Sequence, residues 1–322
     1  MKRFFLHIVS IVGCVLILTF SLGYIVNQGL IHIQDSRFQE WNAILDGDIN
    51  AEVVVLGSSR GVVSYDPTII SNSLGLTTHN LSYNAGSYNL QIDKYNIYRN
   101  KNRSPKIIIQ NIDLSHFSPS THIPNTIDLL PHTNMASVED LFNKYKSDSK
   151  VARNFGVVKY SNYSRYLLKG IYQFFGISQK VGFHDKGHAS VDKKYKEDTS
   201  NLYKLKELAS TNTYENIEKG FVETLQFTKE QSKNCDFVFV SWLPEYKDRF
   251  EINSAYTKKL KERIKAWSDT NERIYFIDLT HYDSIMYHKK YFYDSFHLNK
   301  RGAEVISKGL SGEINKIIKD VF

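Results

Sequence analysis

The sequence predicts an open three-layer α/β sandwich, in which helices cover both faces of a central parallel sheet, preceded by one transmembrane helix. Three observations lead to this fold class. An uncharged apolar run opens the chain, later apolar runs are continuous instead of alternating, and helical patterns separate them. Continuous runs are typical of strands buried on both faces of a parallel sheet. With 322 residues, 42% hydrophobic and 23% charged, the composition excludes a disordered chain, a collagen-like repeat and a coiled-coil rod.

The first element is an apolar run over residues 4–26, which contains no Asp, Glu, Lys or Arg. As a helix, a run of this length rises about 34 Å, enough to cross a hydrocarbon core of about 30 Å. Lys2 and Arg3 precede it, and the positive-inside bias keeps residues 1–3 in the cytoplasm. We expect a single-pass protein of the plasma (inner) membrane, whose remaining residues are exported to the periplasm or the cell exterior.

Two other interpretations of this run remain open. Residues 11–14 resemble a bacterial lipoprotein box with Cys14 as the lipidated residue, and the run could also direct cleaved secretion. The residues after Cys14 stay apolar, however, and the run is longer than a usual signal-peptide core. An uncleaved anchor is therefore the prediction. With Cys14 in the bilayer and Cys235 at the start of a buried strand, no disulfide is expected.

A stalk is predicted at 27–50. Strands and helices are predicted to alternate after it, over residues 51–322. An N-cap at Asp66, a proline at the first turn and Gly75 beyond predict a short helix. Apolar residues at helical spacing predict two later helices, over 256–267 and 306–317. The predicted strands are 51–57, 79–86 (a weaker pattern), 106–113, 236–242 and 273–279.

Residues 118–234 are more chain than one crossover helix needs, and we interpret them as an insertion. Ser137, with acidic residues after it, predicts the start of a helix as a variant of the capping box. Two interpretations stay open for the insertion: it covers a substrate site, or it is a passive helical elaboration.

Three polar residues point to nucleophilic catalysis. Ser59 follows the first strand, at the carboxyl edge of the sheet, where ligands of open α/β sheets bind. Asp294 lies three residues before His297, in a loop leading into the last helix. The carboxylate can there reach the imidazole Nδ1 and leave Nε2 to take a serine proton. The three residues form a triad in the chain order Ser, Asp, His; helix capping is the alternative role for a serine in such a turn.

These segments resemble blocks of the SGNH/GDSL hydrolase superfamily, in its divergent membrane-anchored branch. The matching residues are VVVLGSSR (53–60), YNAG (83–86) and DSFHLN (294–299), and the resemblance covers about 51–117 and 234–322. It implies a flavodoxin-like sandwich with a five-stranded parallel sheet and Ser59 as the nucleophile. It also implies that the backbone N–H of Gly86 joins that of Ser59 in an oxyanion hole.

The sequence departs from the family pattern in two places. Ser58 stands where the family has Asp, a substitution also found in proteins that resemble those transferring D-alanine to teichoic acids. The third block reads Gln110 to Asp113, where the family has an Asn that donates to the oxyanion. In one register Asn111 supplies this donor; in the other, the Asp113 carboxylate faces a developing anion. Loss of one such donor costs about 2.7–4 kcal/mol.

By resemblance, the protein is a serine esterase or O-acyltransferase that acts on acyl groups, with acetyl expected, of an exported or cell-surface polysaccharide. Other envelope proteins of polysaccharide modification are possible partners. The alternative is a non-catalytic module that binds glycan or scaffolds an export complex, because a fold alone does not fix a function.

Two further residues each have a structural and a functional interpretation. Arg60 could hold a substrate carboxylate or phosphate, or form a structural salt bridge; Trp242 could stack on a sugar, or complete the core. No metal or cofactor is expected, because His184 and His188 lie in a lysine-rich loop without a cluster of further ligands. The formal net charge is +7, and nucleic acid is not an expected partner outside the cytoplasm.

Overall fold

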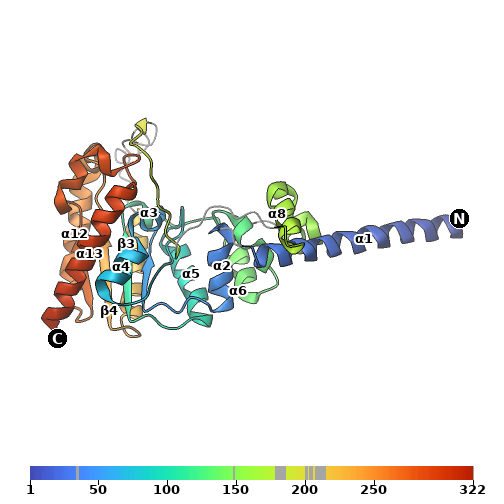
Figure 1. Cartoon of the computed structure of the whole chain (residues 1–322), viewed down its shortest axis with the longest axis horizontal. Coiled ribbons are helices and arrows are strands. Elements are labelled where there is room, and N and C mark those ends of the chain that lie inside the picture. Colours follow the sequence, from blue (N-terminus) through green and yellow to red (C-terminus); the bar gives the residue numbers. More distant parts are fainter. Residues whose placement is uncertain are drawn as a thin grey trace. The chain divides into compact units, whose positions relative to one another are not determined.

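The computed structural model describes residues 1–33, 36–147, 149–177, 186–199, 202, 206 and 215–321. The chain forms two compact units (Figure 1). Unit 1 consists of Met1–Asp46 and Thr121–Phe183, and unit 2 consists of Gly47–Ser120 and His184–Phe322.

Unit 2 contains the predicted parallel sheet. Its strand order is β2-β1-β3-β4-β5, and every neighbouring pair is parallel. The five-stranded parallel sheet is thus confirmed, and its 2-1-3-4-5 order is the flavodoxin-like one. The weaker predicted strand at 79–86 corresponds to β2, which is three residues long and overlaps the prediction only at 79–80. The strands are β1 (Val53–Leu56), β2 (Thr78–Asn80), β3 (Ile107–Ile112), β4 (Phe237–Trp242) and β5 (Ile274–Asp278).

Helices cover both faces of this sheet. On one face, Val55, Ile109 and Phe239 share a buried cluster with Ile306 and Leu310 of the last helix. On the other, α5 and α10 contact each other. The helices of unit 2 are α3 (Ser59–Ser64), α4 (Pro67–Leu74), α5 (Tyr88–Lys101), α10 (Glu215–Gln231), α11 (Lys247–Phe250), α12 (Ser254–Ser268) and α13 (Lys300–Val321), with 3₁₀ turns η1 (Ser115–Phe117), η5 (Glu251–Asn253), η6 (Tyr282–Tyr287) and η7 (Lys289–Tyr291).

The end signals of α4 are confirmed. The Asp66 carboxylate accepts the N–H groups of Thr68 and Ile69, and Gly75 ends the helix at φ +67°. The predicted helices over 256–267 and 306–317 are confirmed as α12 and α13. The predicted cap at Ser137 is wrong: the helix begins at Ala136, with Met135 at the N-cap and no side-chain cap hydrogen bond. Ser137 therefore lies within the first turn.

Unit 1 is helical and contains the apolar run. Within the described residues, α1 is the one helix that is long and apolar enough to cross a membrane by length and composition. Within the expected stalk, residues 27–31 belong to α1 and residues 36–46 form α2, of which Phe38, Trp41 and Ile44 are buried. The elements of unit 1 are α1 (Lys2–Ile31), α2 (Ser36–Asp46), η2 (Thr126–Asp128), η3 (Leu130–His132), α6 (Ala136–Lys144), α7 (Lys150–Asn154), η4 (Gly156–Tyr163) and α8 (Ser164–Phe174).

The second half of α1 packs against part of the predicted insertion. It contacts η4 and α8, as Figure 1 shows for α8. A Cβ atom added at Gly29 would lie 1.8 Å from the carbonyl oxygen of Gly170, and one at Gly23 would lie 2.5 Å from the carbonyl carbon of Gly156. Backbone therefore touches backbone at two points, which only glycine permits.

Replacing Gly29 by alanine tests this contact. We expect Gly29→Ala to destabilise unit 1 by about 1–3 kcal/mol, because the added methyl group forces the two backbones apart. Gly13→Ala is the matched control on the same helix, since a Cβ there meets nothing within 4 Å. Resistance of residues 150–169 to trypsin, measured on the full chain in detergent micelles, should fall for Gly29→Ala alone. Equal resistance of the two variants would contradict the contact.

Candidate active site

Two consecutive serines, Ser58 and Ser59, lie in the turn from β1 into α3 and have different roles. Ser58 is the N-cap of α3, and its hydroxyl oxygen accepts the N–H of Arg60 at 3.4 Å. The same hydroxyl donates to Asp113 Oδ2 at 3.3 Å. The capping role that was the alternative for Ser59 thus belongs to Ser58. Ser59 is the first residue of the helix, and its hydroxyl is left for another partner.

That partner is His297. Ser59 Oγ lies 2.8 Å from His297 Nε2, across 238 positions of sequence. On the other side of the ring, Nδ1 lies 2.9 Å from Asp294 Oδ2 and 3.1 Å from Oδ1. An ionised carboxylate only accepts hydrogen bonds, so Nδ1 carries the ring proton and Nε2 accepts that of the Ser59 hydroxyl. The structure therefore brings the three predicted residues into one hydrogen-bonded chain.

The loop that carries Asp294 and His297 holds the carboxylate in place. Asp294 Oδ1 accepts the backbone N–H groups of Phe296 at 2.8 Å and His297 at 2.7 Å. Burial raises the pKa of Asp294, but the His297 hydrogen bond, its charge and these two N–H groups together hold the pKa below its usual range. The carboxylate thus stays ionised beside the imidazole, as an orienting group requires.

Two further residues, which had no predicted role, shape this loop. The Tyr293 ring stacks on the His297 ring, with centroids 5.2 Å apart and an interplanar angle of 2°. Asn299 accepts the N–H of Gly302 at 3.2 Å and donates to the carbonyls of Lys290 and Phe292. An asparagine directly before a helical pattern is an N-cap signal that could have identified Asn299. No sequence pattern indicates the stacking of Tyr293.

The donors that the resemblance implies for an oxyanion are engaged elsewhere. The N–H of Gly86 donates to the carbonyl of Tyr83 at 2.8 Å, in a turn with Ala85 at φ +57°. The N–H of Ser59 lies at the first position of a helix, where it has no intrahelical acceptor. Of the two predicted backbone donors, the N–H of Gly86 is therefore occupied, and the N–H of Ser59 has no acceptor among the described residues.

The third block places both of its polar residues in the interior. Asn111 is fully buried in β3, and its Nδ2 donates to the carbonyl of Ser241 at 3.4 Å. Asp113 is also fully buried and accepts the N–H of His116. Burial raises the pKa of Asp113, but the Arg60 charge and the hydrogen bonds that the carboxylate accepts outweigh burial and hold this pKa below its usual range. Asp113 is therefore a paired anion beneath Ser58, and neither side chain is exposed beside Ser59.

Two interpretations were given for Arg60, a substrate contact and a structural salt bridge, and its contacts match the second. Its side chain is 1% exposed; Nη2 donates to the carbonyl of Pro244 at 2.6 Å. Nη1 lies 3.5 Å from Glu245 and 4.0 Å from Asp113. The guanidinium also lies over the ring of Phe296, 4.6 Å from its centroid. These contacts favour the salt-bridge interpretation over a substrate contact.

Trp242 belongs to the core. It is 2% exposed, and its ring lies 6.5 Å from that of Phe117. Lys261 Nζ lies 5.7 Å from the indole and also bonds Asp278. No face of the indole is open to a sugar, so the core interpretation of Trp242 is the one that the structure supports.

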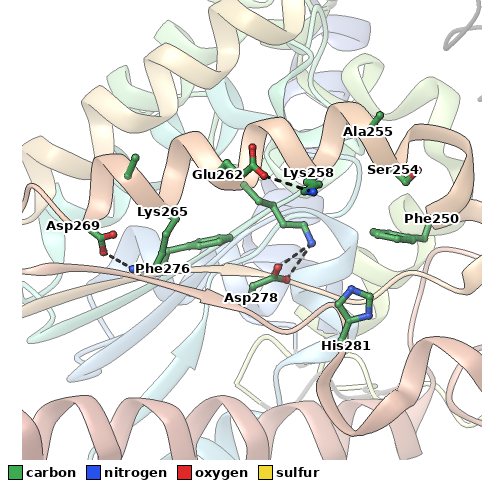
Figure 2. A pocket seen from close by; sticks show the side chains of 12 residues that line it. Phe250, Ser254, Ala255, Lys258, Glu262, Lys265, Asp269, Phe276, Asp278 and His281 are labelled. Carbon is green, nitrogen blue, oxygen red and sulfur yellow. Dashed lines mark hydrogen bonds and ion pairs between the residues drawn. The ribbon is translucent and has the colours of Figure 1, made fainter.

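A surface groove runs along α12 and β5 (Figure 2). Its charges pair with one another: Lys258 with Glu262, Lys265 with Asp269, and Lys261 with Asp278. None of the three triad residues lines it.

The histidines weighed as metal ligands are His184 and His188, with Asp185 beside them in the sequence. Over the part of the chain that the structure describes, no group of three or more His, Cys, Asp or Glu residues could hold a metal ion. His184 and Asp185 lie outside the described residues. His188 is buried, with Nδ1 3.0 Å from the carbonyl of Val62.

Comparisons with known proteins give no functional identification. No protein-family model matches the sequence, and no curated protein matches it. Among solved structures, the chain is similar to a "putative platelet activating factor" from Streptococcus pneumonia, with a TM-score of 0.38, 10% identity, and 95% of this chain and 98% of that chain covered. It is also similar to the acetyl xylan esterase Est2A from the rumen bacterium Butyrivibrio proteoclasticus, with a TM-score of 0.34, 10% identity, and 83% of this chain and 64% of that chain covered. At these scores the similarities carry no argument about activity, and the case rests on the geometry of this chain.

Substituting Arg60 distinguishes its two interpretations. We expect Arg60→Met to destabilise the fold by about 3–5 kcal/mol, because it leaves the buried Asp113 without its counter-charge. Adding Asp113→Asn should recover part of this loss. Urea unfolding of the full chain in detergent, followed by tryptophan fluorescence, measures both. A variant of unchanged stability with a raised KM would instead assign Arg60 to substrate binding.

Proposed function

We propose that the protein is a membrane-anchored serine esterase or O-acyltransferase with Ser59 as its nucleophile. The observation that carries this proposal is the hydrogen-bonded chain from Ser59 Oγ through His297 to Asp294. A serine, a histidine and a carboxylate in this order are what acyl transfer through a serine ester requires. The resemblance of the surrounding blocks to the SGNH/GDSL hydrolases supports the same conclusion.

The first half of the reaction forms an acyl-enzyme. Ser59 Oγ attacks the carbonyl carbon of an ester, and its proton passes to His297 Nε2. Asp294 holds Nδ1–H and stabilises the imidazolium that forms. The tetrahedral intermediate collapses, the alcohol leaves with the proton from Nε2, and the acyl group stays on Ser59.

The second half releases the acyl group. An acceptor hydroxyl gives its proton to His297 Nε2 and attacks the acyl-serine carbonyl, and Ser59 recovers its proton from the imidazolium. Water as the acceptor makes the protein an esterase, and a sugar hydroxyl makes it a transferase. The Tyr293 ring stacked on His297 covers one face of the imidazole and restricts its rotation during both steps.

The oxyanion in this reaction has one donor in place, the N–H of Ser59. Gly86 and Asn111, which the resemblance adds, bond to Tyr83 and Ser241 in this structure. An N–H of Gly86 becomes available only if its turn rearranges when substrate binds. Since an absent donor costs about 2.7–4 kcal/mol, we expect slow turnover on small esters that do not induce this change.

The substrate that we propose is an O-acyl group, in the first place acetyl, on an exported or cell-surface polysaccharide. Two considerations support it: the family resemblance, and the apolar helix α1, which by its length and composition can anchor the domain at the outer side of the plasma membrane. Lys2 and Arg3 before α1 favour a cytoplasmic N-terminus. Partners in this proposal are the acylated glycan, the lipid bilayer and other envelope proteins of polysaccharide modification.

Labelling with a fluorophosphonate probe tests the nucleophile. We expect the probe to label the full chain in detergent and to fail with Ser59→Ala, because it reacts only with an activated serine. Ser58→Ala is the matched control, since its hydroxyl caps the helix and bonds Asp113, and it should keep the label. Labelling of Ser59→Ala at the rate of the natural protein would exclude Ser59 as the nucleophile.

Replacing Asp294 tests the orienting role. Asp294→Asn keeps the shape but lets Nδ1 act as the acceptor, so that Nε2 carries the proton and cannot take that of Ser59. Hydrolysis of an aryl acetate should fall by about 10⁴-fold in kcat, and His297→Ala should abolish it. Equal kcat values for Asp294→Asn and the natural protein would contradict the proposed tautomer.

The same assays distinguish this enzyme from the alternative, a non-catalytic module that binds glycan or scaffolds an export complex. Such a module would neither be labelled nor hydrolyse an aryl acetate, whatever residue stands at position 59. For an active protein, an acetylated glycan that loses acetyl groups identifies an esterase. A glycan that gains them in the presence of an acyl donor identifies a transferase.

A further inference from the structure

Unit 1 exposes a cluster of apolar side chains that its own fold leaves uncovered. Leu168 and Tyr172 of α8 are each 51% exposed, and Phe175 and Ile177, which follow the helix, are each 63% exposed. Phe155, just before η4, is also exposed. Soluble surfaces scatter such residues singly, whereas a cluster of them marks a binding surface.

Helical periodicity gathers these residues on one side of α8. Leu168 and Tyr172 are four positions apart, and Phe175 follows three further on, so the three share one face. The Phe174 and Phe175 rings are in contact, with centroids 5.3 Å apart. The opposite side of α8 is occupied, because Gly170 there packs on Val26 of α1. The exposed face is therefore unpartnered within unit 1.

The exposed Phe155 of the same segment contacts the apolar surface of α1. The Phe155 ring lies 5.5 Å from that of Phe20. A Cβ at Gly156 would lie 2.6 Å from the carbonyl oxygen of Thr19. The contacts of residues 155 and 156, at positions 19–23, lie in the last two turns of the apolar run. Those of Gly170, at positions 26–30, lie at its end and within about 6 Å beyond it. The segment thus lies at the level where interfacial helices bind, about 5–10 Å into the boundary between headgroups and acyl chains.

The charges of the same segment fit an anionic headgroup layer. Residues 149–177 contain five basic residues and no Asp or Glu. Lys150 and Arg165 are exposed, whereas Arg153 is buried and pairs with Glu139, and the Lys159 ammonium donates to the carbonyl of Leu130. Arg165 lies three positions before Leu168, beside the apolar face, as in amphipathic helices that bind membrane surfaces. Each such charge near an anionic surface contributes about 1 kcal/mol of attraction. The basic residues are Lys150, Arg153, Lys159, Arg165 and Lys169.

We propose that residues 149–177 lie in the outer interface of the bilayer that α1 crosses, with the α8 face toward the acyl chains and the basic residues of α8, Arg165 and Lys169, among anionic phospholipid headgroups. This rests on the membrane anchoring of the proposed function but not on its chemistry. The chain thereby binds the membrane at two places, along α1 and across α8, which fixes the tilt of unit 1. A single helix alone would leave unit 1 free to tilt and to rotate about the helix axis.

Tryptophan fluorescence in nanodiscs tests this placement. The full chain is reconstituted, one copy per disc, in phosphatidylcholine with phosphatidylglycerol, with and without brominated acyl chains. Phe175→Trp reports on the α8 face, and Tyr287→Trp, an exposed aromatic of unit 2, is the matched control. Phe5→Trp, 68% exposed on α1, reports on the anchor itself. The natural protein supplies the background of its own three tryptophans.

We expect brominated lipid to quench the Phe175→Trp signal at least threefold more than that of Tyr287→Trp, and to quench Phe5→Trp as well. If brominated lipid quenches Phe5→Trp but not Phe175→Trp, this inference is overturned, while the anchoring by α1 remains supported. No quenching of either overturns both, whereas the labelling of Ser59 is unaffected by either outcome. A blue-shifted Phe175→Trp signal that bromine does not quench would mean that another protein surface covers the face, and would also overturn the inference.

Discussion

The parallel direction of all five strands is the constraint on which the site of unit 2 depends. Because β1, β3 and β4 end at the same edge of the sheet, the segments after them can be joined by a single side chain. Arg60, just after β1, reaches Asp113 after β3, and Pro244 and Glu245 after β4. A buried guanidinium requires such partners, since leaving it unpaired would cost several kcal/mol. The fixed start of α3 then determines where the hydroxyl of Ser59 points.

The other half of the site is ordered locally. Asp294 is bound by two N–H groups and the imidazole within three residues of its own position. Asn299 ties the end of this loop to the carbonyls of Lys290 and Phe292 and to the first turn of α13. A loop stabilised by its own backbone can present His297 in a fixed orientation with little dependence on the rest of the fold. The hydrogen bond between His297 and Ser59 and the contact of the Phe296 ring with Arg60 join it to the β1 side.

Sequence patterns predicted those parts that depend on neighbouring residues. The continuous apolar runs, the ends of α4 and the three-residue spacing of Asp294 and His297 are all local. The availability of Gly86 and Asn111 is not local, because it depends on a turn around Ala85 and on the carbonyl of Ser241 in another strand. The same reason explains why residues 36–46 and 121–177 could not be assigned to one helical unit with α1: the contacts of α1 with η4 and α8 join segments more than a hundred residues apart.

Those contacts also bear on whether the N-terminal helix is retained. Gly23, Val26, Gly29 and Leu30 are the buried residues of α1, and they pack on the backbone at Gly156 and Gly170. A signal peptide that is removed after its apolar core has no reason to match the surface of the mature protein at glycine-to-glycine distance. Its removal there would expose the inner face of η4 and α8 and leave Leu30 and its neighbours without a partner. The packing of unit 1 thus depends on α1, whose buried residues form part of its core.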